Sequence, residues 1–335
     1  MKKFILERKN QICHGSDQEL FSNLVNVYKR FRYYQASLNL EVFLRFIEMF
    51  PDLIVNILLS YAMLNHEVSD FLHTYRDRFG KIILDSGTWT LNKAKDSAIK
   101  LITLDNYQCY LMRYGHLYDF YINFDSNFTE AGAEENQYNQ MVLEDAGLHP
   151  VPVVHDIYGP EIDQYIKAGY KRIALGSSQI HTQRDMAHVM RRLDGTGIKI
   201  HTLGKSGFNL LGYFLIDSSD SAMWAREGGY GYLCWLNPNR KGDDKTDRVY
   251  LEEFLSVSNS HKYSYFSYEF KEDFDNYLLN TFNLKYYDFF YKDNEGKSNA
   301  YNKMIVNMYY YVKLEEEINK MHQKIRSLQE GVAGS

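Results

Sequence analysis

The sequence predicts an α/β protein built on a (β/α)8 TIM barrel, and three observations support this fold class. From about residue 51, short apolar runs alternate with segments of helical spacing. The runs are almost continuously apolar, which is typical of parallel strands buried on both faces. A glycine follows several of the expected helices, as it does at helix C-termini. Eight strand–helix units predict the barrel, while a doubly wound parallel sheet stays open as the alternative.

The expected elements alternate regularly along the chain. Strands are expected at 53–60, 81–86, 118–125, 151–155, 172–176, 199–204, 215–220 and 230–236. Helices are expected at 66–78, 105–114, 130–146, 160–168, 183–193, 208–212 and 222–227. Because a helix separates each strand from the next, successive strands are expected to run parallel.

Three regions are expected in the chain. They are an N-terminal helical extension packed on the barrel (1–50), the (β/α)8 catalytic core (51–237), and an insertion with C-terminal helices that close the barrel (238–335). In the first region, the spacing of apolar residues predicts helices at 18–33 and 38–50, and Pro51 ends the second.

The C-terminal region carries the clearest helical pattern, at 301–328, where apolar residues recur three and four positions apart. This pattern predicts a seam that packs against another element. Packing on the outside of the barrel is one interpretation, and a homodimer or a contact with a partner protein through this helix is the other. Shorter helices are expected at 250–256 and 270–282.

Composition excludes several classes of protein. A net charge of -5 gives no overall attraction to nucleic acid or to anionic membranes. The three cysteines are far apart in the sequence, so neither a thiolate zinc site nor a disulfide framework is expected, and no metal or cofactor is predicted. The most apolar segment, 53–64, is too short to span a bilayer, and the N-terminus is a poor signal peptide. A cytoplasmic protein without a membrane partner is therefore expected.

Polar residues stand at or near the carboxyl ends of the expected strands: Asp85, Asp125, His155, Gly176, Gly204 and Asp220. In a barrel these ends form one face, where active sites lie. Paired carboxylates at a common cleft suit chemistry at a glycosidic carbon. Asp85, His155, His201 and Asp220 are also metal-ligand types, which keeps a metal-dependent barrel hydrolase open, although no HxH or HxxxH pair supports it.

Six short motifs contain these residues. They are Asp85-Ser86-Gly87-Thr88-Trp89, Tyr121 to Asp125, Pro152 to His155, Ile173 to Ser177, His201 to Lys205, and Ile216 to Arg226. Their order over residues 53–236 resembles that of the tRNA-guanine transglycosylases, which comprise the queuine and archaeosine tRNA-ribosyltransferases. Members of that family are barrels that exchange guanine for a 7-deazaguanine base. The last motif is similar to the family pattern Ile-Asp-x-x-Asp-(five residues)-Arg, with Asp220 in the nucleophile position.

The resemblance implies two catalytic roles. Asp220 would attack C1′ of the target nucleoside, expel guanine and form a glycosyl-enzyme intermediate. Asp85 would move protons on the departing and incoming bases.

The resemblance also implies a set of residues that bind the base: Ser86, Trp89, Asp125, His155, Gly176, Leu203 and Gly204. Asp125 would accept hydrogen bonds from the N–H edge of a guanine-type base, and Gly176 would offer backbone groups. Trp89 would stack on one face of the base and Leu203 would cover the other. The target nucleotide would have to be flipped out of its stack.

Departures from the family pattern refine the expectation. The CxCxxC zinc motif is absent, no RNA-binding domain is evident after residue 237, and His155 and Thr88 replace a glutamine and a glycine. These differences favour the DNA-directed branch, the DpdA-type enzymes of phages, which insert 7-deazaguanines such as preQ0 into DNA. The expected partners are then DNA and a 7-deazaguanine base, in the host cytoplasm if the protein is phage-encoded.

Four cations are candidates for contacts with phosphate, namely Lys205, Arg226, Arg240 and Lys241. Arg226 has a second interpretation, as a structural partner of Asp217, which is otherwise expected to bond to nearby backbone. Base exchange in DNA is the leading hypothesis. The alternatives are the same exchange on tRNA, the metal-dependent hydrolase, and a non-enzymatic subunit that binds a partner through its C-terminal helix.

Overall fold

The computed structural model describes residues 30–88, 102–126, 132–252, 264–290 and 300–333, with side chains up to residue 329. Most of the helix expected at 18–33, and Trp89, lie outside these residues. Within them, no helix combines the length and the apolar character needed to cross a membrane.

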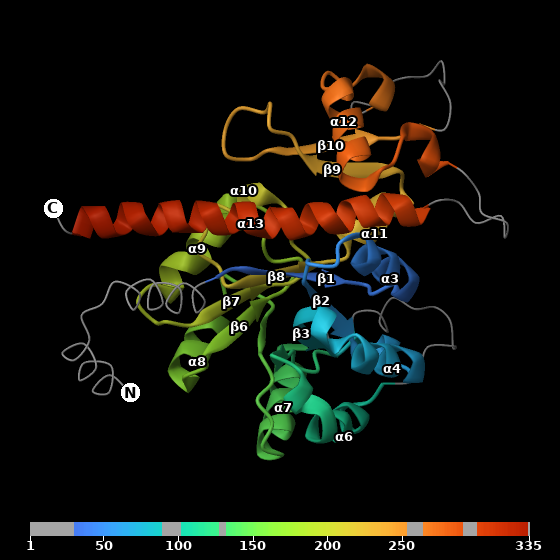
Figure 1. Cartoon of the computed structure of the whole chain (residues 1–335). Helices are drawn as coiled ribbons and strands as arrows, with labels where there is room; N and C mark the ends of the chain where they lie inside the picture. Colours follow the sequence, from blue (N-terminus) through green and yellow to red (C-terminus); the bar gives the residue numbers. More distant parts are fainter. Residues whose placement is uncertain (1–29, 89–101, 127–131, 253–263, 291–299, 334–335) are drawn as a thin grey trace, which may run out of the picture.

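Eight parallel strands form one curled sheet at the centre of the molecule (Figure 1). They are β1 (Arg32–Ala36), β2 (Val55–Ser60), β3 (Phe79–Asp85), β4 (Phe120–Tyr121), β5 (Val153–Val154), β6 (Arg172–Leu175), β7 (Lys199–Thr202) and β8 (Ser218–Ser221). The order across the sheet is β4-β3-β2-β1-β8-β7-β6-β5. The first strand borders the last, as in an opened barrel, whereas β1 of a doubly wound sheet borders the strand that begins the second half.

The two outer strands meet only at one bridge among the described residues. Ile122, just after β4, pairs in parallel with Val151, just before β5. Two backbone hydrogen bonds make this bridge, from Asn123 N to Val151 O (3.0 Å) and from Val151 N to Tyr121 O (2.8 Å). A continuous ladder is missing along this seam, so the sheet is barrel-like and curled rather than fully closed.

Helices follow the strands and cover the outside of the sheet (Figure 1). They are α3 (Leu40–Met49), α4 (His66–Thr74), α6 (Leu104–Tyr114), α7 (Gly132–Asp145), α8 (Glu161–Ala168), α9 (Gln183–Leu193), α10 (Phe208–Leu211) and α11 (Met223–Gly229). Local signals start several of them: Asn39 caps α3 through Val42 N, and Thr182 and Asp185 form a capping box on α9. The predicted α/β alternation is therefore confirmed.

Two cores lie on the two faces of the sheet. Apolar side chains between sheet and helices form the larger one. The inside of the curl is filled by residues from β1 to β6 and their flanks: Tyr34, Ala36, Leu58, Ile83, Phe120, Ile122, Val151, Val153 and Ala174. The centre is therefore a packed core and leaves chemistry to the strand ends.

Two expectations about the ends of the sheet are wrong. Residues 32–33, expected in a helix, begin β1, which lies in the middle of the sheet, so the sheet starts well before the expected boundary at residue 51. The expected eighth strand is β9 (Tyr232–Leu236), which pairs antiparallel with β10 (Thr246–Tyr250) in a separate two-stranded sheet. Asp220 therefore lies on the eighth strand, not the seventh, and pairs with Tyr34 of β1.

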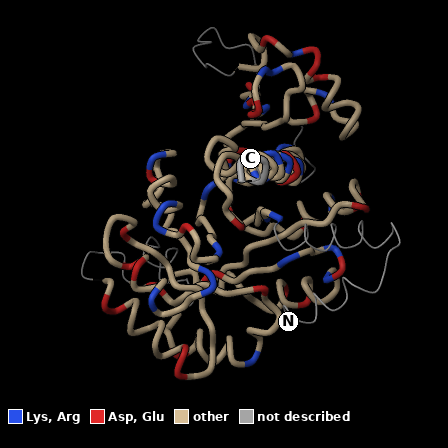
Figure 2. Tube along the Cα trace, turned by 90° about the vertical axis from the view of Figure 1, so that its left-hand side faces the viewer, with Lys and Arg blue, Asp and Glu red and all other residues tan. Residues whose placement is uncertain are grey.

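The long helix α13 (Ala300–Ala333) lies between the curled sheet and the β9–β10 hairpin (Figure 1). Figure 2 views it almost end-on and shows the same separation. Tyr311 stacks on Tyr33 of β1 with ring centres 4.9 Å apart. Buried Glu315 accepts hydrogen bonds from Tyr33 N (2.8 Å) and Asn56 Nδ2 (2.9 Å). The apolar seam of this helix is thus used largely within the chain.

A smaller layer lies beyond α13. It contains β9, β10 and α12 (Lys271–Phe282), which matches the helix expected at 270–282. Trp235 of β9 packs against Phe274 and Tyr277 of α12. Residue 250, expected to begin a helix, ends β10 instead, and 253–256 lie outside the described residues.

Candidate active site

The carboxyl ends of the strands gather the acids that the sequence singled out. Asp85 ends β3, Asp125 follows β4, His155 follows β5 and Asp220 lies in β8. The carboxylates are near enough to interact, because Asp220 raises the pKa of Asp85 and Asp85 raises that of Asp125, in each case after the larger effect of burial. The structure therefore brings the three predicted aspartates to one end of the sheet.

Asp220 is held from one side. Its Oδ1 lies 3.2 Å from His201 Nε2 and accepts a hydrogen bond from Gly204 N at 3.2 Å. Both hydrogen-bond contacts that the described residues make with this carboxylate involve Oδ1. Gly204 has a φ of +67°, which favours glycine, and this conformation turns the backbone after β7 toward the carboxylate. Oδ2 is thus the oxygen available to a bound molecule.

His201 is completely buried, and a chain of hydrogen bonds fixes the position of its ring. Arg172 Nη1 donates to Ser218 Oγ (3.4 Å), and Ser218 Oγ lies 2.9 Å from His201 Nδ1. A hydroxyl that accepts from a guanidinium can still donate its own proton or accept a second one, so Ser218 fits either tautomer of the ring. Arg172 and Ser218 thus position His201 so that its Nε2 faces Asp220.

Asp85 lies in a turn that depends on glycine. Its Oδ2 accepts a hydrogen bond from Gly87 N at 2.9 Å. Gly87 has a φ of +82°, and a Cβ there would lie 2.6 Å from Ala62 Cβ and from Ser60 Oγ. Ser86 is buried, with its hydroxyl 3.2 Å from that of Thr88. Burial raises the pKa of Asp85 to about 6, so this carboxyl can hold and release a proton near neutral pH.

Replacing Asp85 by asparagine is expected to stabilise the fold at neutral pH. Because its folded pKa of about 6 exceeds the unfolded value near 3.9, ionisation of Asp85 opposes folding above pH 6. This cost disappears as the pH falls toward 4. We expect a gain on the order of 1 kcal/mol at pH 7.5 and almost none at pH 4. Urea unfolding at both pH values measures it.

The matched control for this variant is Asp77→Asn, which changes an exposed acid just before β3. It should alter the free energy of unfolding by less than about 0.5 kcal/mol at either pH. A loss of stability in Asp85→Asn at pH 7.5 would contradict the raised pKa of Asp85 in the folded protein.

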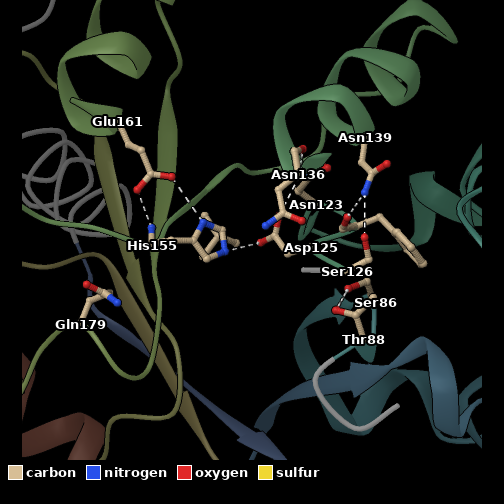
Figure 3. Close-up of polar contacts among 12 residues, drawn as sticks. Ser86, Thr88, Asn123, Asp125, Ser126, Asn136, Asn139, His155, Glu161 and Gln179 are labelled. Atoms are coloured by element: carbon tan, nitrogen blue, oxygen red, sulfur yellow. Dashed lines mark hydrogen bonds and ion pairs between the residues drawn. The ribbon is translucent and has the colours of Figure 1, made fainter. Parts of the chain in front are cut away.

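Asp125 is the first member of a row of polar groups drawn in Figure 3. Its Oδ1 accepts a hydrogen bond from Asn123 Nδ2 (2.8 Å), and its Oδ2 lies 3.5 Å from His155 Nε2. The other ring nitrogen, Nδ1, lies 3.4 Å from Glu161 Oε1. Burial raises the pKa of Asp125 to about 7, although His155 acts in the opposite direction.

Two asparagines of α7 hold the segment that carries Asp125. Asn123 Nδ2 donates to Asn136 O (2.9 Å), and Asn139 Nδ2 donates to Phe124 O (2.8 Å) and to Ser126 Oγ (3.2 Å) (Figure 3). Both α7 residues are buried. Sequence reasoning missed them, and it missed Glu161, which looked like an ordinary acid in the first turn of a helix.

The remaining predicted base-binding residues lie at the same strand ends. Gly176 follows β6 and donates its N–H to Val154 O at 3.1 Å, and a Cβ there would lie 3.1 Å from that oxygen. Half-buried Leu203 follows β7 and packs against the inner core. Trp89, the remaining residue of that set, lies outside the described residues.

The four predicted cations do not gather at the carboxylates. Lys205 follows β7 and is half-buried, near the strand ends, and Arg226 is exposed on α11. Arg240 bonds to Asp247 (2.8 and 3.0 Å) in the β9–β10 hairpin, where Lys241 also lies. That hairpin is across α13 from the curled sheet (Figures 1 and 2).

Asp217 bonds to nearby backbone, which was one of the two expectations for this residue; the other was a pair with Arg226. Its Oδ2 accepts a hydrogen bond from Ile200 N at 2.8 Å. Burial raises its pKa, and the cations that act against this are Arg172, Lys199 and Arg326, not Arg226. Asp217 thus ties β8 to β7 below the nucleophile candidate.

The donor arrangement does not favour the metal-dependent hydrolase. Within the described ranges, no three or more His, Cys, Asp or Glu side chains are grouped as a metal ion would require. His201, one of its four proposed ligands, directs both ring nitrogens into hydrogen bonds with Ser218 and Asp220.

Comparisons with known proteins add no assignment. No family model matches the sequence, and no curated protein is significantly similar to it.

Proposed function

We propose that the protein is a transglycosylase that exchanges guanine for a 7-deazaguanine base in DNA through a covalent aspartyl–glycosyl intermediate. One observation carries the proposal: Asp220 is bonded through Oδ1 to His201 and Gly204, on a shared face with a proton-holding Asp85 and with Asp125. We further propose that the curled sheet works as a TIM-type barrel, in which this face is the catalytic one. The resemblance of the strand-end motifs supplies the substrate class.

In the first half-reaction, Asp220 Oδ2 attacks C1′ of the target nucleoside. A bond forms between this oxygen and C1′, the C1′–N9 bond breaks, and its electron pair leaves with guanine. His201 and Gly204 keep Oδ1 occupied, which orients the carboxylate for attack through its other oxygen. Because the attacking group is part of a strand, its position is rigid.

Asp85 completes the proton balance of the exchange. Its carboxyl protonates the departing guanine, and the resulting carboxylate accepts a proton from the incoming 7-deazaguanine. The incoming nitrogen then attacks C1′, and Asp220 leaves as a carboxylate. A pKa of about 6 suits a group that must give and accept a proton in one cycle.

Asp125 is the proposed reader of the base. An ionised carboxylate accepts the two adjacent N–H groups that guanine presents. Gly176 follows β6, and since its N–H is bonded to Val154 O, only the second lone pair of its carbonyl oxygen is left for the same base. Reading this edge requires the nucleotide to leave the helix stack, which costs a few kcal/mol and is offset by contacts in the site. Lys205 is the cation nearest in sequence to the site that could meet the phosphate backbone.

The test is transfer of radiolabelled guanine into nucleic acid by the purified protein. We expect label in duplex DNA and none in unmodified tRNA, and label should be chased out by unlabelled preQ0. Transfer into tRNA alone would support the tRNA alternative. No transfer into either polymer, combined with release of free guanine that a chelator stops, would favour the hydrolase instead.

A further inference from the structure

Glu161 is a partly buried acid at the site that neither catalytic role uses. It begins α8, and its Oε2 accepts hydrogen bonds from His155 N and Asp156 N, each at 2.7 Å. The two backbone donors fix the position of this oxygen. The other oxygen, Oε1, faces the ring of His155 at 3.4 Å (Figure 3). Glu161 is thus fixed by backbone and aimed at the imidazole.

His155 has a carboxylate at each ring nitrogen. Glu161 lies 3.4 Å from Nδ1 and Asp125 lies 3.5 Å from Nε2. A neutral imidazole has no net charge to offer two carboxylates, whereas an imidazolium attracts both of them by charge. The geometry therefore favours the charged ring, with Glu161 behind it and the base-reading acid in front.

The groups that face this pair are mostly acidic. Beyond Glu161 and Asp125, Asp85 adds negative charge from β3, and the phenol of Tyr165 lies on α8 near both carboxylates. Burial lowers the pKa of His155, but its hydrogen bond to Glu161 and the charge of Asp125 outweigh this, and the pKa is raised. The imidazolium is thus a counter-charge within a group of acids.

We propose that Glu161 holds His155 as an imidazolium that keeps Asp125 ionised, and that this makes the site select bases with two adjacent N–H donors. The selectivity for such bases rests on the proposed base exchange. The charge interactions among Glu161, His155 and Asp125 do not depend on it. Glu161 and His155 are positioning residues that act through Asp125. Guanine and 7-deazaguanines with a 2-amino group present both donors, and hypoxanthine presents one.

The chemical consequence is a preference for guanine over hypoxanthine that depends on pH. With Asp125 ionised, hypoxanthine leaves part of a buried carboxylate without a donor, which lowers its affinity roughly 10- to 100-fold. When Asp125 is protonated, it presents a hydroxyl donor, and the preference for guanine falls. Loss of the Glu161 charge should move this transition to higher pH, because the imidazolium loses its support.

The first experiment measures the titration of His155 in the ligand-free protein by histidine ring NMR. The resonance is assigned by its loss in His155→Gln. We expect a midpoint above about 6.5 in the wild type and a drop of about one unit or more in Glu161→Gln, which keeps an acceptor for the two backbone N–H groups. Asp163→Asn, an exposed acid on the same helix, should leave the midpoint unchanged. A wild-type midpoint at or below 6.5, or no response to Glu161→Gln, would overturn the proposal.

The second experiment measures binding of guanine and of hypoxanthine to Asp220→Asn protein, which cannot turn over, between pH 5.5 and 8.5. We expect guanine to bind at least tenfold better at pH 8, and the preference to shrink when Glu161→Gln is added. In the exchange assay the same change should raise KM for the base and leave kcat nearly unaltered. Equal binding of both bases would overturn the selectivity. If neither base binds but His155 titrates as expected, base exchange is refuted and the charge interactions among Glu161, His155 and Asp125 are supported.

Discussion

Asp220→Asn is expected to lower the rate of base exchange by about 10⁴-fold or more. The amide is close in size to the carboxylate and can still accept the hydrogen bond from Gly204 N, so the strand end should keep its shape. An amide is not a competent nucleophile at C1′, however, and the glycosyl-enzyme intermediate cannot form. Initial rates of guanine transfer measure the loss, and circular dichroism checks the fold.

A trapping assay makes this prediction sharper. When incoming base is withheld, wild-type protein should form a complex with DNA that survives a denaturing gel, and Asp220→Asn should form none. Asp217→Asn is the matched control, because Asp217 lies three residues earlier and accepts a backbone hydrogen bond that an amide oxygen can also accept. That control should keep most of the transfer rate. Full activity in Asp220→Asn would eliminate the aspartyl intermediate.

Asn307→Leu is expected to lower the free energy of unfolding by about 3–5 kcal/mol. Asn307 is completely buried in α13, where Oδ1 accepts from Cys234 N (2.8 Å) and Nδ2 donates to Tyr232 O (2.9 Å) and Trp224 O (3.4 Å). The leucine variant leaves three backbone groups of α11 and β9 buried without this partner. This one side chain connects the long helix to the smaller layer beyond it.

Urea unfolding followed by tryptophan fluorescence suits this measurement. Asn307 bonds to the backbone of Trp224 and of Cys234, the residue before Trp235, so both tryptophans report on the elements it holds. Gln323→Ala, an exposed change on the same helix, is the control and should stay within about 0.5 kcal/mol of wild type. A loss below 1 kcal/mol in Asn307→Leu would show that the hairpin layer is not coupled to α13 through these bonds.

Local pattern was sufficient for most of the sheet. Seven of the eight expected runs overlap the strands β2 to β8. The apolar character of most of them reflects burial on both faces of the sheet. The acids could be found for the same reason: a charged residue at the end of a buried run is costly unless something there uses it. Asp85, Asp125 and Asp220 were therefore visible as candidates before any contact was known.

Two strands show where local pattern fails. The stretch Arg32–Ala36 is short and comes at the end of a segment whose apolar residues have helical spacing. Tyr232–Leu236, in contrast, is as apolar as a barrel strand. Which of them joins the sheet depends on pairing partners almost 200 residues away, since β1 pairs with β8. The helix α13 covers one face of β1 and separates β9 from the sheet, and no window of sequence contains that information.

The sequence by itself determined the alternation of elements and the acids at the strand ends, because burial and strand length are properties of neighbouring residues. Only the tertiary structure decided what surrounds each acid. The buried His201 behind Asp220 and the Glu161–His155 pair beside Asp125 come from different strands and helices, and the polar atoms of these contacts lie 3.2 to 3.5 Å apart. Protonation in such a site depends on which charges converge in a buried space, and that convergence exists only once the sheet has curled.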